Sequence, residues 1–266
     1  MKLYILDDLD IIDNMYEFYA YSSKGNHRNV NEDCFLINNH VSNESYYQKM
    51  TKFKFKNREE FVVAIADGVG GHKGGAFASQ YILNQLANIK ETDYIPTVRE
   101  QIYTAHHKLR IESAKHNLPN AATTLTLLTS LNEYITIYHV GDTRAYKLTP
   151  TKLVQLTTDQ TKLQEIINEL PIFSPVRKYL PFNNVLLKAI GASMDSLSID
   201  ITKTTIEPND ILLLTTDGIH DYLSNSEIET ILRKYKSIKT VVHKLITKAS
   251  NISKDNMTAI GIHFKN

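Results

Sequence analysis

The 266-residue sequence has only one cysteine, Cys34. An internal disulfide therefore cannot form, and a zinc site built on several cysteines is excluded. A single cysteine fits a reducing compartment. Because no covalent cross-link is available, the fold must depend on its core, for which a hydrophobic content of 42% is ample.

The sequence also lacks an excess of charge of either sign, because 30 Lys plus Arg face 29 Asp plus Glu. No overall field favours nucleic acid or an anionic membrane, and we expect neither as a partner. No apolar run approaches the roughly 20 residues that a membrane span needs. The first 14 residues contain four aspartates, which contradicts the basic start of a secretory signal. These features predict a soluble, monomeric protein of the cytoplasm.

Internal repeats, low-complexity linkers and shifts of composition are absent as well, so we expect residues 1–266 to form a single domain. Apolar periodicity predicts helices at residues 75–89, 94–117, 162–170, 226–236 and 238–249. Strands are predicted at residues 16–22, 34–37, 61–66, 199–206, 210–216 and 257–264, and at 123–131, 134–140 and 144–148 as an antiparallel meander. The polar stretch 38–58 is expected to be a surface excursion such as a long hairpin.

This order of elements predicts the fold class. Several strands are followed by two helices, then by more strands, two further helices and a last strand. Such an order suits two packed sheets flanked by helices better than a strictly alternating parallel fold. We therefore expect an α+β protein, a four-layer α-β-β-α sandwich with two mainly antiparallel sheets.

Two aspartates follow apolar segments and are themselves followed at once by glycine. Asp67 comes directly after the run 61–66, and Asp217 comes soon after the run 211–214. Asp-Gly is a favoured turn pair, so either dipeptide alone indicates a turn more often than a site. Asn31-Glu32-Asp33 taken alone would be a solvated loop, and Asp255-Asn256 taken alone could be a turn or the end of a helix.

Taken together, these four acids suggest a metal site. Mg²⁺ and Mn²⁺ are hard cations that prefer carboxylate, carbonyl and water oxygens. A site for them needs several acids from separate segments, and acids at strand ends and in loops can converge. Gly68 can add its backbone carbonyl, because it has no side chain to block a close approach. The pattern therefore predicts a metallohydrolase.

Short motifs follow one another between residues 25 and 264. They are Arg28-Asn29-Val30-Asn31-Glu32-Asp33, Ala66-Asp67-Gly68-Val69-Gly70-Gly71-His72, Ala122-Thr123-Thr124, Gly141-Asp142-Thr143-Arg144, Leu156-Thr157-Thr158-Asp159, Ala189-Ile190-Gly191, Thr215-Thr216-Asp217-Gly218 with Asp221, and Asp255-Asn256-Met257-Thr258. Each motif is weak alone, but their order is specific. In this order they resemble the metal-dependent protein phosphatases of the protein phosphatase 2C type, and the motif residues are those typical of the bacterial branch.

The resemblance implies a site for two Mn²⁺ or Mg²⁺ ions. Asp67 would bridge the two ions. Asp217 and Asp255 would complete the coordination of one ion. Glu32 and the carbonyl of Gly68 would hold the other.

The resemblance also implies roles for residues around the two ions. Asp33 would orient the attacking water, and Arg28 would bind the substrate phosphate through its planar, bidentate guanidinium. Asp142 and Asp221 match positions that help the bacterial branch to hold a third, weaker metal ion. Residues 161–185, which contain three prolines, lie where the family has a flap beside the site.

The implied reaction is hydrolysis of phosphoserine and phosphothreonine in proteins by a hydroxide that bridges two metal ions. Such an enzyme would act on phosphoproteins and reverse a cognate Ser/Thr kinase. No covalent phosphoenzyme is required, so Cys34 is expected to pack in a buried strand. A regulatory pseudophosphatase would keep the fold and lose metal ligands, but here all the metal carboxylates are present. A two-metal nuclease is disfavoured by the neutral charge.

The sequence departs from the family pattern in a few places. Gln160 and Thr161 stand where His and Ser often follow the aspartate of the fifth motif. Val69 stands where eukaryotic relatives often have a histidine that is proposed as the general acid. Bacterial relatives frequently have an apolar residue there, so protonation of the leaving oxygen is expected to fall to metal-bound water.

Overall fold

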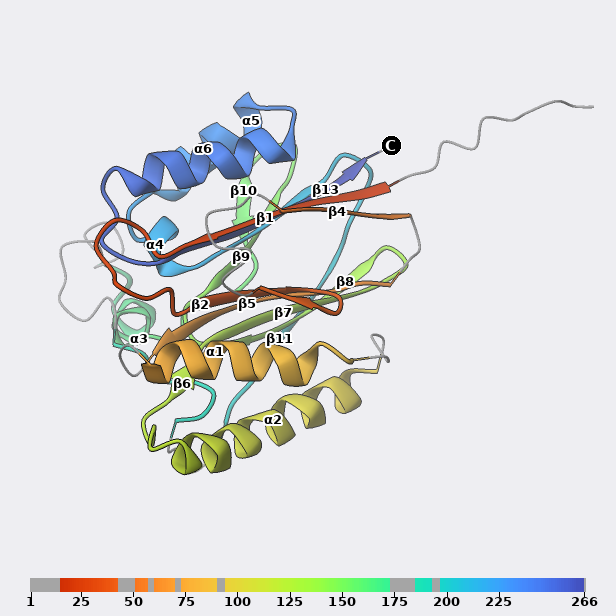
Figure 1. Cartoon of the computed structure of the whole chain (residues 1–266). Helices are drawn as coiled ribbons and strands as arrows, with labels where there is room; N and C mark the ends of the chain where they lie inside the picture. The colour runs from red at the N-terminus through yellow and green to blue at the C-terminus, as the bar shows by residue number, and fades with distance from the viewer. Residues whose placement is uncertain are drawn as a thin grey trace, which may run out of the picture.

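Two antiparallel β-sheets lie face to face at the centre of the protein, and helices cover the outer face of each sheet (Figure 1). The structure is a computed structural model that describes residues 15–42, 51–56, 60–69, 73–89, 94–172, 185–192 and 197–265. The layers follow one another as helix, sheet, sheet and helix (Figure 1). The predicted α+β, four-layer sandwich is therefore confirmed.

The first sheet has six strands in the order β10-β9-β12-β13-β1-β4. They are β1 (Met15–Ser23), β4 (Thr51–Lys56), β9 (Arg144–Leu148), β10 (Leu153–Gln155), β12 (Ile211–Thr215) and β13 (Met257–Lys265). β13 lies between β12 and β1, with Gly261 opposite both Leu213 and Tyr19. Strands from opposite ends of the chain thus share the middle of this sheet.

The second sheet has the strand order β11-β8-β7-β5-β2-β3, and β6 pairs with β5 beside that path. Its strands are β2 (Asp33–Ile37), β3 (His40–Val41), β5 (Val62–Val69), β6 (Ala122–Thr123), β7 (Leu125–Leu131), β8 (Tyr134–Val140) and β11 (Asp200–Thr205). β2 and β5 lie next to each other with Asp33 opposite Asp67. This register places two of the predicted site residues side by side.

Successive side chains of a strand point to opposite faces, so each sheet fills two layers of core. In β1, Phe18 packs between the two sheets and Tyr19 packs toward the helices. In β5, Ile65 packs between the sheets and Ala64 packs on the helix side. Full burial of a side chain such as Phe18 contributes about 1.5–3 kcal/mol. The alternation therefore fixes the register of the central strands.

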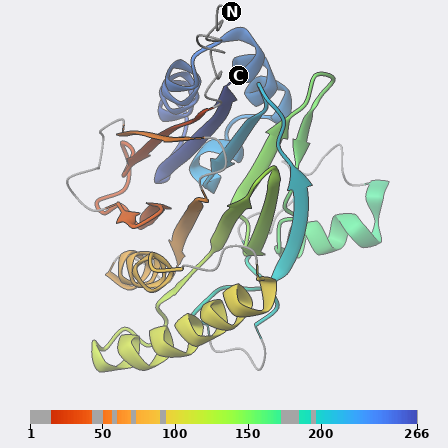
Figure 2. The same cartoon turned by 90° about the vertical axis from the view of Figure 1, so that its right-hand side faces the viewer.

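Two pairs of helices form the outer layers (Figure 1). The helices are α1 (Lys73–Leu86) and α2 (Ile95–Lys115) on the second sheet, and α5 (Asn225–Lys234) and α6 (Ile238–Ser250) on the first. α3 (Lys162–Glu169) lies beside the sheets and not in either helix layer (Figure 2). The short α4 (Asp217–His220) follows β12 at one end of the sandwich.

The predicted helices and strands are confirmed, and the helix ends lie within three residues of those predicted. The predicted antiparallel meander over residues 123–148 is wrong in part. β7 and β8 do pair, but β9 pairs with β10 and β12 of the other sheet. Gly141, at a φ of 104°, turns the chain between β8 and β9 and allows it to pass from one sheet to the other.

The prediction of a surface excursion at residues 38–58 is also wrong in part. β3 does form a hairpin with β2. β4, however, pairs with β1 in the other sheet, and its Phe53 packs against the core between the sheets. Residues 43–50 and 57–58 lie outside the described part of the chain. Along β4, Thr51 and Phe53 are half-buried, whereas Lys52 and Lys54 are exposed.

A buried histidine in α2 makes the stability of the fold depend on pH. His106 is 2% exposed, and its Nδ1 accepts a hydrogen bond from the backbone N–H of Gly191 at 3.0 Å. Burial, together with His107 and Arg110, lowers the pKa of His106 from 6.5 to about 4. At a pH between about 4 and 6.5, His106 therefore binds a proton in the unfolded chain but not in the folded chain. The stability from neutral His106 is complete above about pH 6.5 and is lost as the pH falls toward 4.

We expect wild type to lose on the order of 1–2 kcal/mol more unfolding free energy than His106→Gln between about pH 7 and pH 4.5. Glutamine keeps an acceptor for Gly191 but does not titrate. Urea unfolding at a series of pH values measures the difference. Parallel stability profiles for the two proteins would contradict the prediction.

Candidate metal centre

Aspartates from four segments gather near α4, which lies at one end of the sandwich (Figure 1). Asp33 begins β2, Asp67 is opposite it in β5, Asp217 begins α4 directly after β12, and Asp255 precedes β13. The electrostatic effects of Asp217 and Asp255 reach both Asp33 and Asp67. The structure thus brings together the four aspartates singled out in the sequence, two from each sheet.

Burial and mutual repulsion act on all the inner carboxyl groups. Burial, followed by the charges of Asp217 and Asp33, raises the pKa of Asp67 well above its usual value. Burial, followed by Asp221 and Asp255, raises the pKa of Asp217 to about 7, although a hydrogen bond with Asp67 acts in the opposite direction. A cation among these groups would stabilise their ionised forms.

Asp33 is fixed by two threonines of the opposite sheet. Its Oδ2 accepts hydrogen bonds from the hydroxyls of Thr216 and Thr258, both at 2.8 Å. Its Oδ1 is buried and has no hydrogen-bond partner among the described residues. Burial raises the pKa of Asp33 and the two threonines lower it, while Asp217 and Asp255 raise it further. One oxygen is therefore anchored and the other is left to accept a bond from a bound group.

The backbone of Glu32 is held on both sides. Its N–H donates to Oδ1 of Asn256 at 2.8 Å. Its carbonyl accepts from the hydroxyl of Ser79 at 2.6 Å and from the N–H of Gly68 at 3.1 Å. The Asn256 amide also donates to the carbonyls of Lys24 and Val30, at 3.0 and 2.9 Å. Asn256 thereby shapes the loop that carries Glu32.

Two glycines allow the start of α1 to approach Glu32 and β5 closely. A Cβ at Gly68 would overlap the backbone of Gly75. A Cβ at Gly75 would lie 2.7 Å from the carbonyl oxygen of Gly68 and 3.0 Å from Cδ of Glu32. Any other residue would force α1 away from the site. Gly70, Gly71 and His72 of the same motif lie outside the described residues.

The two threonines of the third motif hold the backbone of Asp67. The Asp67 N–H donates to the Thr124 hydroxyl at 2.9 Å. The Asp67 carbonyl accepts from the Thr124 N–H and from the Thr123 hydroxyl, both at 2.9 Å. Asp67 does not end its strand as the sequence suggested, because Gly68 and Val69 continue β5 by pairing with β6. This added pairing gives Asp67 a rigid setting.

Arg28 lies at the rim of the site. Its Nη2 donates to Oδ2 of Asp255 at 2.6 Å, and its side chain is 49% exposed. This hydrogen bond, with the charges of Asp255, Glu32 and Asp217, raises the pKa of Arg28. The predicted phosphate ligand thus contacts a predicted metal ligand, and it must turn outward to meet a phosphate. Its exposure leaves room for that movement.

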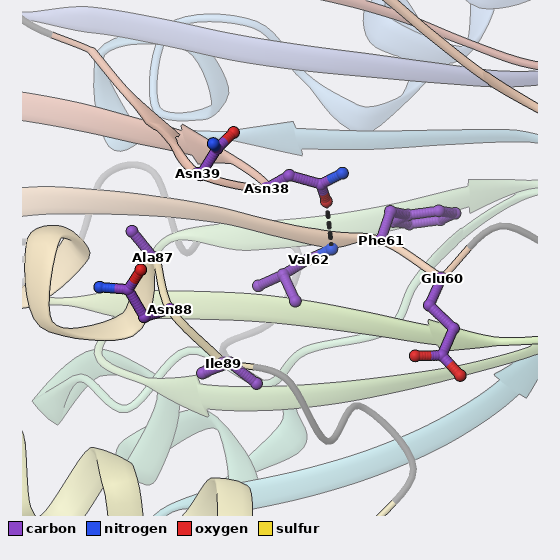
Figure 3. A pocket seen from close by; sticks show the side chains of 8 residues that line it. All are labelled: Asn38, Asn39, Glu60, Phe61, Val62, Ala87, Asn88 and Ile89. Carbon is purple, nitrogen blue, oxygen red and sulfur yellow. Dashed lines mark hydrogen bonds between the residues drawn. The ribbon is translucent and has the colours of Figure 1, made fainter.

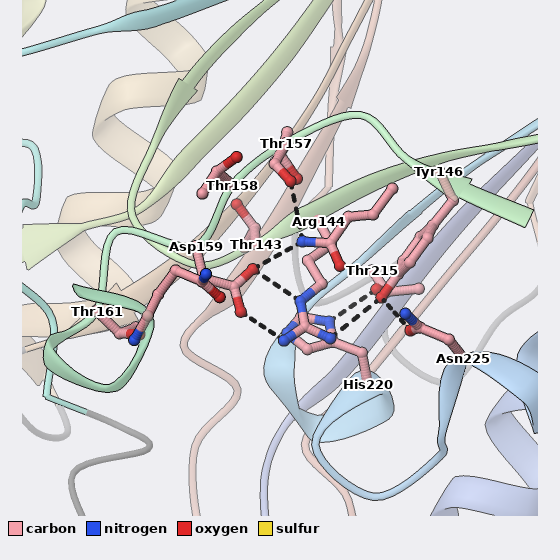
Figure 4. A network of polar contacts seen from close by, with 12 residues as sticks. Thr143, Arg144, Tyr146, Thr157, Thr158, Asp159, Thr161, Thr215, His220 and Asn225 are labelled. Atoms are coloured by element: carbon pink, nitrogen blue, oxygen red, sulfur yellow. Dashed lines mark hydrogen bonds and ion pairs between the residues drawn. The ribbon is translucent and has the colours of Figure 1, made fainter. Parts of the chain in front are cut away.

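Asp142 and Asp221 belong to the same electrostatic cluster. Burial, then Asp217, Asp159 and Asp221, raise the pKa of Asp142, whereas Arg144 lowers it. Arg144 is itself buried and makes a bidentate ion pair with Asp159, at 2.8 and 2.5 Å (Figure 4). This pair fixes the segment after β10 beside the loop that carries Asp142.

The carboxylates form a suitable but not a preformed donor set. Within the described residues, no group of three His, Cys, Asp or Glu side chains is already placed to hold one ion. The site oxygens are carboxylates and a carbonyl, the donors that Mg²⁺ and Mn²⁺ prefer. The buried Oδ1 of Asp33 and the mutual repulsion of the aspartates both favour a bound cation. The residues therefore fit hard divalent ions after small turns of their side chains.

A cavity of about 380 Å³ lies away from these residues (Figure 3). Asn38, Phe61, Val62 and Ile89 are among its lining residues. In the pairing of β2 with β5, Asp33 and Asp67 stand at one end, while Asn38 and Val62 lie at the other. The cavity is therefore no part of the carboxylate cluster.

Solved structures share this architecture. The Mycobacterium tuberculosis serine/threonine phosphatase PstP is 23% identical with a TM-score of 0.80, over 95% of this chain and 100% of that chain. A PstP catalytic domain in complex with two manganese ions is 23% identical with a TM-score of 0.77, over 95% and 100% of the two chains. These two likenesses show that the chain shares the fold of those structures.

The model of the family described as Protein phosphatase 2C matches residues 38–258, and the chain belongs to this metal-dependent family. Serine/threonine phosphatase stp of Listeria monocytogenes is 30% identical over 218 residues, covering 77% of this chain and 86% of that protein. The chain is thus a protein serine/threonine phosphatase. The expected family and enzyme class are confirmed, whereas the roles of single residues stay predictions.

The membrane prediction can be compared with the helices of the structure. Across the described ranges, every helix is too short or too polar to cross a bilayer.

Four residues that support the site were not predicted from the sequence. They are Asn256, Ser79, Thr216 and Thr258. Asn256, Thr216 and Thr258 stand in the quoted motifs, and their position beside the acids was the only signal available for them.

Asn256→Ala removes one acceptor and two donors from the loop that carries Glu32. At about 1 kcal/mol for each buried hydrogen bond, we expect it to lower the unfolding free energy by about 2–4 kcal/mol. It should also weaken Mn²⁺ binding, because Glu32 loses its support. Urea unfolding and calorimetric titration with Mn²⁺ test the two effects. The exposed Asn251→Ala is the control, and equal behaviour of the two variants would contradict the role of Asn256.

Proposed function

We propose that this phosphatase hydrolyses phosphoserine and phosphothreonine in proteins with two Mn²⁺ or Mg²⁺ ions held by the acidic cluster. The observation that carries the proposal is the convergence of Asp33, Asp67, Asp217 and Asp255 from separate segments, where Asp217 and Asp255 raise the pKa of both Asp33 and Asp67. A buried cluster of like charges is costly unless cations are bound. The manganese-bound relative supports the same conclusion.

The metal ligands would come from both sheets. Asp67 would lie between the two ions, Asp217 and Asp255 would hold one of them, and Glu32 with the carbonyl of Gly68 would hold the other. When bound, the ions supply Lewis acidity and neutralise the charge that develops on the phosphoryl group. The support for this assignment is that Thr123, Thr124, Asn256 and Ser79 fix the backbones that carry these ligands.

Two further residues would act on the substrate and on water. Asp33 can accept a hydrogen bond from the attacking water through Oδ1, since Oδ2 is occupied by Thr216 and Thr258. Arg28 would leave Asp255 and donate to two oxygens of the phosphate, which suits its planar guanidinium. Its departure would also free Asp255 for an ion. The arrival of metal and phosphate would thereby be linked.

We also infer that the substrates are phosphoproteins of the cytoplasm that a cognate Ser/Thr kinase modifies. The chain is proposed to act as a monomer and as one catalytic domain. The pairing of β1 with β13 supports a single domain, because it joins segments from opposite ends of the sequence. The proposed flap, residues 161–185, is described only at 161–172 and at 185.

Asp67→Asn should abolish Mn²⁺-dependent hydrolysis of p-nitrophenyl phosphate and of a phosphothreonine peptide. We expect kcat/KM to fall at least 100-fold, since loss of a supporting residue alone costs about 10–100-fold. Asp200→Asn, at an exposed position of β11, is the matched control and should keep full activity. Calorimetric titration with Mn²⁺ should show loss of binding in Asp67→Asn only.

The outcome that would refute the proposal is wild type that turns over no faster than Asp67→Asn with Mn²⁺ present. A wild type that binds phosphopeptide without turnover would instead indicate a regulatory pseudophosphatase. Equal activity with and without a chelator would show that the reaction does not use a metal ion.

A further inference from the structure

Gln160 joins three segments of the chain. Its backbone N–H donates to the carbonyl of Gly141 at 2.7 Å, and its side-chain Oε1 accepts from the N–H of Gly141 at 2.9 Å. Its own carbonyl accepts from the N–H of Leu187 at 2.9 Å. Gln160 thus binds both the backbone N–H and the carbonyl of Gly141, and it also binds the backbone N–H of Leu187.

The bond to Gly141 fixes the orientation of the Gln160 amide. Only the oxygen of an amide can accept from an N–H, so Nε2 must point the other way. Nε2 is buried and has no hydrogen-bond partner among the described residues. A buried amide donor without a partner is unfavourable, so stability alone does not account for glutamine at this position.

Gly141 has a backbone conformation and a close neighbour that favour glycine. Its φ is 104°, and a Cβ on it would lie 2.6 Å from Cγ2 of Thr124. Thr124 in turn binds the backbone of Asp67. Gly141 therefore lies between Gln160 and Thr124, and Asp142 follows it in the chain. The direction in which Asp142 leaves the turn depends on how Gly141 is held.

The same junction closes the segment proposed as the flap. The N–H of Lys162 donates to the carbonyl of Val185 at 2.9 Å, and Thr161 forms an antiparallel bridge with Leu186. Thr161 also caps α3 by accepting from the N–H of Gln164. Both ends of the segment therefore meet at Gln160, next to the turn that carries Asp142.

We propose that Gln160 is a positioning residue that acts through Gly141 to hold Asp142 toward Asp217 and Asp221, and so supports the binding of an additional, weaker divalent cation there. The inference rests on the proposed metal-dependent function. The geometry at the position fits it, because Arg144 of β9 pairs with Thr215 of β12, so that Asp142 before β9 and Asp217 after β12 lie at the same end of the two strands. Asp221 follows Asp217 by four residues. Three carboxylates suit a hard divalent ion.

The test is a calorimetric titration of the full chain with Mn²⁺, for wild type and for Gln160→Ala. We expect the affinity of the weakest site to fall about 10–100-fold, as is usual when a supporting residue is removed. The affinities of the tighter sites should stay unchanged. Gln160→His, which restores an acceptor of the kind common in the family, should recover most of the lost affinity.

Asp142→Asn shows whether Gln160 acts through Asp142. If it does, Gln160→Ala should have no further effect on Mn²⁺ binding in the Asp142→Asn background. Gln164→Ala is the matched control, since Gln164 is a glutamine of α3 whose side chain bonds Asn168 and not Gly141. If Gln160→Ala does not fold, Gln160→Asn keeps the amide but is one methylene too short to reach Gly141, and it replaces the alanine variant.

The inference would be overturned by unchanged Mn²⁺ affinities in Gln160→Ala, by an equal loss at all sites, or by a full-sized effect in the Asp142→Asn background. A wild type that binds two ions and no more would also overturn it, while leaving the proposed function intact. A wild type that binds no Mn²⁺ would refute the proposed function and this inference with it.

Discussion

The two hydrogen bonds that Asp33 accepts from Thr216 and Thr258 are the interaction on which the site depends. Asp33 belongs to the second sheet, whereas Thr216 follows β12 and Thr258 lies in β13 of the first sheet. The bonds therefore join the two sheets at the end where the aspartates meet. Much of the remaining contact between the sheets is an apolar cluster, and apolar contact has no fixed direction. At this end the polar bonds set the spacing between Asp67 and Asp217.

The site brings carboxyl groups of like charge together inside the protein. Hydrogen bonds to the surrounding backbone hold these groups in place. The charges that most raise the pKa of Asp67 are those of other aspartates. Such groups move apart unless rigid elements hold them, and when held together they take up protons more readily. Asp67 lies inside a strand that continues beyond it, and Asp217 begins a helix directly after a strand. The fold thus keeps acids together that would repel one another in a flexible loop.

Much of the fold could be predicted from the sequence, because apolar periodicity is a local property. The helices and strands were found this way, and the motif order gave the family. The meander failed because a turn at Gly141 changes the sheet of the next strand, and such a change leaves the local pattern intact. The acids were visible from their neighbours. Their supports, such as Thr258 and Asn256, act on residues far away in the sequence, so no spacing reveals them.

The central position of β13 has a consequence for the synthesis of the chain. The bond between Thr258 and Asp33 joins residues that are 225 positions apart. A ribosome releases β1 and β2 long before β13, and contacts between such distant residues form slowly. Until β13 emerges, β1 can pair only with β4, and Asp33 lacks the Thr258 bond. A nascent chain therefore cannot assemble the complete acidic cluster until this strand is inserted.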